Sequence, residues 1–149
     1  MQFTGNSIEF TWIAGNSVPD VPGNYGNYPG GRHYALGWTS SDNNLYIMGG
    51  MGLGNSSLTT MDPKIDLSDF WKFNLNSNTW EWISGSQSGY MDVSSVYPGT
   101  RISSATWVDA TGNLWLCGGT GYSNGVLGDI GDLWSFDITL KQWTLKNSK

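Results

Sequence analysis

Two arginines stand at equivalent places in this sequence, each at the end of a similar segment: Tyr28-Pro29-Gly30-Gly31-Arg32 and Tyr97-Pro98-Gly99-Thr100-Arg101. A guanidinium can hold a carboxylate through two parallel hydrogen bonds, whether that carboxylate belongs to a ligand or to the protein. We therefore consider Arg32 and Arg101 as candidate ligand or partner contacts. The alternative is a structural ion pair between repeat units or hydrogen bonds to loop carbonyls, and the recurrence of the position favours this alternative.

The single histidine, His33, follows the first arginine and has no counterpart in the second segment, where Ile102 stands. This departure from the repeat is a hint of function, so His33 joins the candidate contact residues. One imidazole does not make a metal site. We predict no bound metal and no cofactor.

Carboxylates gather in or beside glycine-rich stretches, and clustered oxygens of this kind are what calcium requires. Their spacing is not that of an EF-hand loop. Two of them also precede a Trp by two residues at equivalent positions, which favours a role at the start of a strand. The residues concerned are Asp62, Asp66, Asp69, Asp129 and Asp132, of which Asp69 and Asp132 precede a Trp.

Cys117 is the one cysteine, which excludes an intrachain disulfide and a CxxC zinc site. It aligns with Met48 in an apolar segment, so we expect a small buried hydrophobic residue. Three tyrosines in predicted loops are candidates for contact with a protein partner or a sugar: Tyr25, Tyr90 and Tyr122. The segment Asn55-Ser56-Ser57 is a formal glycosylation sequon, which alone decides little about location.

Composition excludes several classes of protein. The chain has 7 Lys and Arg against 12 Asp and Glu, a net charge of -5, and no basic run, so a nucleic-acid partner is not expected. No stretch approaches the roughly 20 apolar residues of a membrane span. The high contents of Gly (21 residues) and Trp (9 residues) are typical of short, half-buried strands joined by tight turns.

The elements that position these residues form an internal repeat. A shift of 69 residues superposes 28–52 on 97–121 without a gap, and 10 of these 25 positions are identical. A shift of 63 residues superposes Asp69-Phe70-Trp71-Lys72-Phe73 on Asp132-Leu133-Trp134-Ser135-Phe136, and Trp80 on Trp143. The length difference therefore lies between residues 53 and 68, as expected for a surface loop.

Each unit predicts four short strands and no helix. In the first unit they cover about 32–38, 45–48, 69–73 and 79–82, and the second unit repeats them. Phe10-Thr11-Trp12-Ile13-Ala14-Gly15 is similar to Trp80-Glu81-Trp82-Ile83-Ser84-Gly85, so residues 7–14 are expected to form the last strand of a preceding unit.

This arrangement resembles the kelch repeat, in which a strand ending in Gly-Gly is followed by an aromatic strand and a Trp near the end of the unit. The residues that carry the resemblance are Gly49-Gly50, Trp71 with Phe73, and Trp80, then Gly118-Gly119, Trp134 with Phe136, and Trp143. The resemblance implies an all-β fold of four-stranded β-propeller blades. It would also bring Arg32 and Arg101 near the mouth of a central channel.

We expect two complete kelch-type blades preceded by one strand of another blade. The predicted boundaries are 1–27 for the leading strand and its loop, 28–82 for the first blade, 83–96 for an inter-blade loop and 97–149 for the second blade. Propellers commonly have four to eight blades, and a blade cannot bury both apolar faces alone. The two blades are therefore expected to belong to a larger propeller or to a ring closed by oligomerisation.

The expected function is that of a non-enzymatic interaction or assembly module, whose long loops on one rim bind a protein or a glycan. The partner would be another protein or further copies or blades of the same polypeptide. The enzymatic alternative is the propeller portion of a galactose oxidase-like enzyme, although the copper ligands of that family would need more than His33 and Cys117. An extracellular or cell-surface location is slightly favoured over the cytoplasm.

Overall fold

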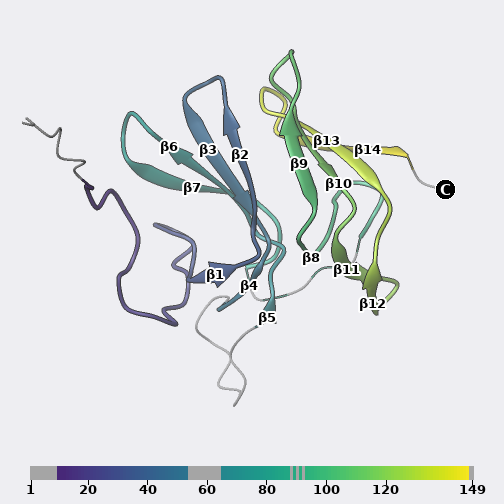
Figure 1. Cartoon of the computed structure of the whole chain (residues 1–149), viewed down its shortest axis with the longest axis horizontal. Coiled ribbons are helices and arrows are strands. Elements are labelled where there is room, and N and C mark those ends of the chain that lie inside the picture. The colour runs from purple at the N-terminus through teal and green to yellow at the C-terminus, as the bar shows by residue number, and fades with distance from the viewer. Residues whose placement is uncertain (1–9, 54–64, 88, 90, 92, 148–149) are drawn as a thin grey trace, which may run out of the picture.

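The computed structural model describes residues 10–53, 65–87, 89, 91 and 93–147. Within these ranges the protein contains strands, turns and loops and no helix, as the sequence predicted. The described strands form four antiparallel sheets (Figure 1). No helix in the described part of the chain is long and apolar enough to cross a membrane.

Two of the sheets have four strands each and correspond to the two sequence repeats. The first large sheet has the order β2-β3-β6-β7 and consists of β2 (Leu36–Ser40), β3 (Asn44–Met48), β6 (Phe70–Asn74) and β7 (Thr79–Ser84). The second large sheet has the order β9-β10-β13-β14 and consists of β9 (Ala105–Val108), β10 (Leu114–Cys117), β13 (Leu133–Asp137) and β14 (Gln142–Asn147). In each large sheet, strands that lie side by side are thus consecutive among the four strands of that unit.

Two small sheets lie together at one end of the large ones, at the bottom of Figure 1. One has the order β1-β4-β5 and consists of β1 (Arg32–His33), β4 (Met51–Gly52) and β5 (Ile65–Asp66). The other has the order β8-β11-β12 and consists of β8 (Arg101–Ile102), β11 (Thr120–Ser123) and β12 (Val126–Asp129). We call this end of the molecule the rim.

The first strand predicted in each unit is divided in two by a residue in the left-handed region. Tyr34 has φ +55° and Ser103 has φ +58°, and these two residues are 69 positions apart, as the repeat requires. Each separates a short rim strand from the strand at one edge of a large sheet. The prediction of a continuous strand from Arg32 to Trp38 was therefore wrong at this point.

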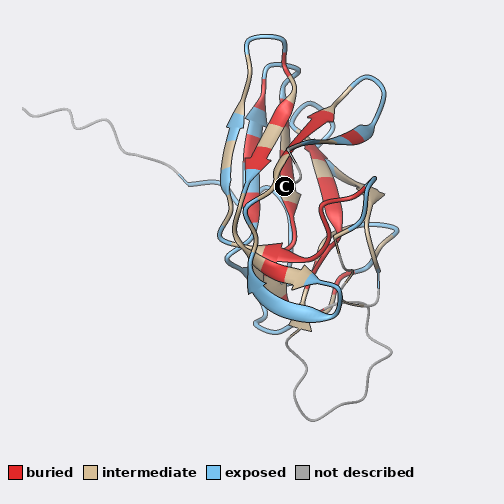
Figure 2. Ribbon diagram, turned by 90° about the vertical axis from the view of Figure 1, so that its right-hand side faces the viewer, coloured by how far each residue is buried: buried red, intermediate tan, exposed pale blue. Residues whose placement is uncertain are grey.

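The hydrophobic core lies between the two large sheets. In β2 every second residue is buried, as expected for a strand with one covered face. The Phe70 ring lies edge-on to Phe136 with ring centroids 4.8 Å apart, and 5.3 Å from the Trp143 centroid. Figure 2 shows the buried stretches on the strands of both large sheets and the exposed ones at the turns. A hydrogen bond of 2.8 Å from Trp38 Nε1 to the Trp115 carbonyl also joins the sheets.

The opposite face of the second large sheet carries exposed residues. Cys117 is exposed, which corrects the expectation that it is buried like Met48. Met48 faces the second large sheet, whereas Cys117 lies on a face that none of the described sheets covers. Trp107, on the same face, is 43% exposed.

The predicted leading strand falls partly outside the described residues, since 7–9 are not among them. Residues 10–14 form no strand here, and Phe10 and Trp12 are exposed. That strand was predicted to pair with a preceding sheet, and it stays a prediction.

Candidate functional site

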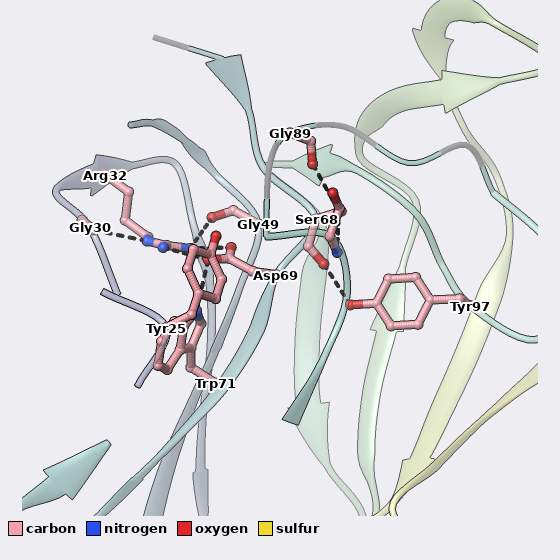
Figure 3. Close-up of polar contacts among 10 residues, drawn as sticks. Tyr25, Gly30, Arg32, Gly49, Ser68, Asp69, Trp71, Gly89 and Tyr97 are labelled. Carbon is pink, nitrogen blue, oxygen red and sulfur yellow. Dashed lines mark hydrogen bonds and ion pairs between the residues drawn. The ribbon is translucent and has the colours of Figure 1, made fainter. Parts of the chain in front are cut away.

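Arg32, the first candidate residue, is held by the carboxylate of Asp69 in a bidentate ion pair (Figure 3). Arg32 Nη1 lies 2.6 Å from Asp69 Oδ1, and Nη2 lies 2.8 Å from Oδ2. The guanidinium also donates to the carbonyls of Gly30 and Gly49, at 3.2 and 3.1 Å. The Arg32 side chain is 7% exposed and that of Asp69 is fully buried.

Arg101 repeats this arrangement in the second unit. Its Nη1 and Nη2 lie 2.7 and 2.9 Å from the two carboxylate oxygens of Asp132. The guanidinium donates to the carbonyl of Gly118 at 3.0 Å and to that of Pro98. The Arg101 side chain is fully buried, and each of its partners is the repeat equivalent of a partner of Arg32 or lies one residue from it.

An indole completes each unit. Trp71 Nε1 donates to Asp69 at 2.7 Å, and Trp134 Nε1 donates to Asp132 at 2.6 Å. Each carboxylate thus accepts two hydrogen bonds from an arginine and one from an indole, and anchors the start of β6 or β13. We call these two sets the Arg–Asp–Trp units.

Only the first unit has an additional tyrosine among the described residues. Tyr25 donates its hydroxyl to Asp69 at 2.9 Å and packs its ring on Trp71, with centroids 5.1 Å apart. Burial raises the pKa of the Tyr25 hydroxyl, and the charge of Asp69 and the hydrogen bond to it raise this pKa further. Tyr25 is therefore a neutral donor in the unit.

A second polar cluster ties the connection between the large sheets to the first of them. Tyr97 donates its hydroxyl to the carbonyl of Ser68 at 2.6 Å, and burial raises the pKa of this hydroxyl. Ser68 Oγ accepts from the Ser86 amide and donates to the Gly89 carbonyl, each at 3.1 Å. Gly85 lies in the same place with φ +91°, where an added Cβ would meet the Ser68 carbonyl.

These contacts determine what the arrangement can do chemically. Arg32, Arg101, Asp69 and Asp132 satisfy one another inside the protein, and the Tyr25 hydroxyl is used as a donor to Asp69. The structure gives the two arginines the carbonyl bonds of the structural alternative. Their ion pairs lie within each repeat unit, which corrects the expectation of ion pairs between units. A ligand contact by these residues stays a prediction.

The other predicted contact residues lie at the rim. His33 is exposed in β1, with its ring 4.9 Å from that of Tyr34. Tyr122 is half-buried in β11, where its carbonyl accepts from the Val93 amide at 3.0 Å. Tyr90 lies outside the described residues. The structure therefore places His33 and Tyr122 on the rim and Tyr25 in the first Arg–Asp–Trp unit.

The candidate calcium ligands are not brought together. Asp69 and Asp132 are in different units, and Asp129 accepts from Thr120 Oγ1 at 2.9 Å across the β11–β12 pair. Among the described residues no group of three or more His, Cys, Asp or Glu side chains could hold a metal ion. Asp62 and the sequon Asn55-Ser56-Ser57 lie outside the described residues.

Sequence reasoning missed two features of this region. It did not pair each arginine with its aspartate, although both recur with the repeat and carry opposite charges, which was a usable signal. It also missed the exposed apolar side chains of the β11–β12 hairpin, where Val126 is 68% exposed and Leu127 is 53% exposed.

Comparison with known proteins gives a likeness of fold alone. No family model and no curated protein matches the chain. Among the similar chains in solved structures is one titled "Structure of YjhT", with a TM-score of 0.55 and 19% sequence identity. The match covers 79% of this chain and 38% of that one, so this chain spans well under half of the structure it matches.

Proposed function

We propose that this chain forms two blades of a kelch-type β-propeller, over residues 28–82 and 97–149, and that its rim is a non-enzymatic protein-binding surface. The agreement between sequence repeat and sheet order supports the blades.

The observation that carries the binding proposal is the exposed apolar pair at the rim. Val126 and Leu127 follow the Asn124-Gly125 turn, where both residues have positive φ, and β12 is an edge strand. All four residues of β12 are exposed. Apolar side chains gathered at an exposed edge mark an interaction surface more often than a solvated one.

The buried polar groups support a binding role over a catalytic one. In each Arg–Asp–Trp unit the charges of the arginine and the aspartate neutralise each other. The pair joins a rim strand, β1 or β8, to the start of β6 or β13. A rigid support under the loops is what a recognition surface requires, since ordering a loop on binding costs affinity.

The test is a binding comparison between two variants of matched chemistry. Val126→Ser with Leu127→Ser alters the rim, and Leu140→Ser alters an equally exposed leucine (69% exposed) in the turn between β13 and β14, at the other end of the second sheet. We expect a protein captured by the immobilised chain to be lost with the rim variant and retained with the Leu140 variant.

Equal loss with both variants would contradict a binding site at the rim. A glycan array serves as a second arm, because retention of a sugar by the rim would replace the protein partner with a glycan. Stoichiometric copper measured by mass spectrometry would contradict the non-enzymatic proposal.

A further inference from the structure

The uncovered side of the second large sheet carries a second apolar surface, which we call the open face. It consists of residues on β9, β10 and β13: Ala105, Trp107, Trp115, Cys117 and Leu133. We propose that this face binds the first large sheet of a second copy of this chain, so that copies associate head to tail. The inference does not depend on what the rim binds.

The repeat itself shows what covers such a face. The equivalents of the open-face residues in the first unit are Leu36, Trp38, Tyr46, Met48 and Phe70, and all five are at most 5% exposed. They form the first sheet's half of the core and pack against the second large sheet. The same positions are thus covered by a following sheet in the first unit. In the second unit Ala105, Trp107 and Cys117 are exposed, and Trp115, with Lys146 Nζ 5.7 Å from its ring centroid, and Leu133 are half-buried.

The residues of the open face are already arranged for this contact. The Trp107 and Trp115 rings are stacked, with centroids 5.7 Å apart and an interplanar angle of 12°, and Trp115 Nε1 donates to Asp109 at 2.7 Å. Two ordered indoles lose little side-chain freedom on association. Large aromatic residues of this kind dominate the energetics of interfaces.

A hydrogen bond at the existing contact has an equivalent on the open face. Trp38 Nε1 donates to the Trp115 carbonyl of the second large sheet at 2.8 Å. Trp107 is the repeat equivalent of Trp38, and Tyr46 is the equivalent of Trp115. In the proposed pair, Trp107 Nε1 therefore donates to the Tyr46 carbonyl of the second copy.

A second copy also carries the matching surface. The second large sheet contributes Leu114, Leu116, Trp134, Phe136 and Trp143 to the core, and their equivalents in the first unit are Leu45, Ile47, Trp71, Phe73 and Trp80. Leu45 and Ile47 are half-buried and Gly37 beside them is exposed, so the part of this surface on β2 and β3 is accessible. Trp71 and Phe73 are already buried against Tyr25 and Trp80 of the same chain. Association of one face with a different face is heterologous, and it closes into a ring when the rotation per copy allows.

The experiment measures native mass and the rate of Cys117 alkylation over a series of concentrations of the chain. We expect masses above that of one chain, and slower alkylation as concentration rises, because Cys117 lies on the open face. Trp107→Asp should raise the dissociation constant at least about tenfold, as expected for an interfacial Trp. Leu140→Asp, a matched change at an exposed leucine outside both the open face and the rim, should leave it unchanged.

Ala105→Arg provides a second open-face variant in case Trp107→Asp impairs folding, which circular dichroism would show. The mass of one chain at every concentration would overturn the inference, as would an equal effect of Leu140→Asp. Protection of Cys117 only when a different protein is added would also overturn it, because the occupant would then not be a second copy.

Discussion

Replacing Asp132 with alanine should destabilise the protein severely, because it leaves the guanidinium of Arg101 buried without a counter-charge. The Arg101 side chain is fully buried, and both of its terminal nitrogens bond to Asp132, at 2.7 and 2.9 Å. Removal of one partner of such a pair costs about 3–5 kcal/mol. The variant also deprives Trp134 Nε1 of its acceptor at 2.6 Å.

A surface pair in the same protein provides the matched control. Lys141 Nζ lies 2.8 Å from Glu81 Oε1, with the two side chains 56% and 43% exposed. Because water screens this pair, Lys141→Ala should cost at most about 1 kcal/mol. Because burial distinguishes the two ion pairs, loss of the buried one is predicted to cost severalfold more stability than loss of the exposed one.

The assay is urea unfolding followed by tryptophan fluorescence at neutral pH. Asp132→Asn gives an intermediate variant that keeps one acceptor oxygen, in case the alanine variant is unfolded from the start. Arg101→Met combined with Asp132→Leu should recover part of the loss, since no charge is then left unpaired. An Asp132→Ala protein within about 1 kcal/mol of the wild type would refute the reasoning.

Three further predictions concern the connection between the sheets and the surface charges. Gly85→Ala should lower stability by more than Gly125→Ala in urea unfolding, because an added Cβ at Gly85 meets the Ser68 carbonyl whereas at Gly125 it meets nothing within 4 Å, and both positions have positive φ; equal losses would show that backbone strain alone matters. Tyr97→Phe should cost about 1–3 kcal/mol in the same assay by removing the 2.6 Å hydrogen bond to the buried Ser68 carbonyl, and no loss would contradict that bond. Hydrogen bonds from Lys141 and Lys72 lower the pKa of Glu81 below 4.5, so the ionised Glu81 stabilises the fold above about pH 4.5 and this effect is lost as the pH falls through the lowered pKa. The difference in unfolding midpoint between wild type and Glu81→Gln should therefore shrink on acidification. A constant difference would exclude this ion-pair network.

The large sheets could be predicted from the sequence because their signal is repeated. The apolar segment 45–48, the Gly-Gly pair after it and the aromatic segment around Trp71 occur twice. In both units the apolar segment and the aromatic segment form strands, as predicted. Two copies of a short pattern are much more specific than one, since a chance match does not repeat in register.

The rim could not be predicted for two physical reasons. Strands of two residues, such as β1 and β8, are too short to show any alternation. Tyr34 and Ser103 interrupt the predicted strand before β2 and β9. Tyrosine and serine rarely adopt positive φ, so neither residue type predicts a turn at these positions.

The exposure of Cys117 shows the limit of alignment within a repeat. Alignment identified its position correctly, as the equivalent of Met48 on one face of a sheet. Exposure depends in addition on what lies against that face, and this differs between the two units. The pairing of Arg101 with Asp132 was accessible in principle, since opposite charges recurred with the repeat.

Nuclear Overhauser contacts between aromatic rings of the two large sheets test whether one repeat packs against the other. We expect contacts from the Phe70 ring to both Phe136 and Trp143, whose centroids lie 4.8 and 5.3 Å away. Contacts of Phe70 confined to residues of its own sheet would contradict this packing.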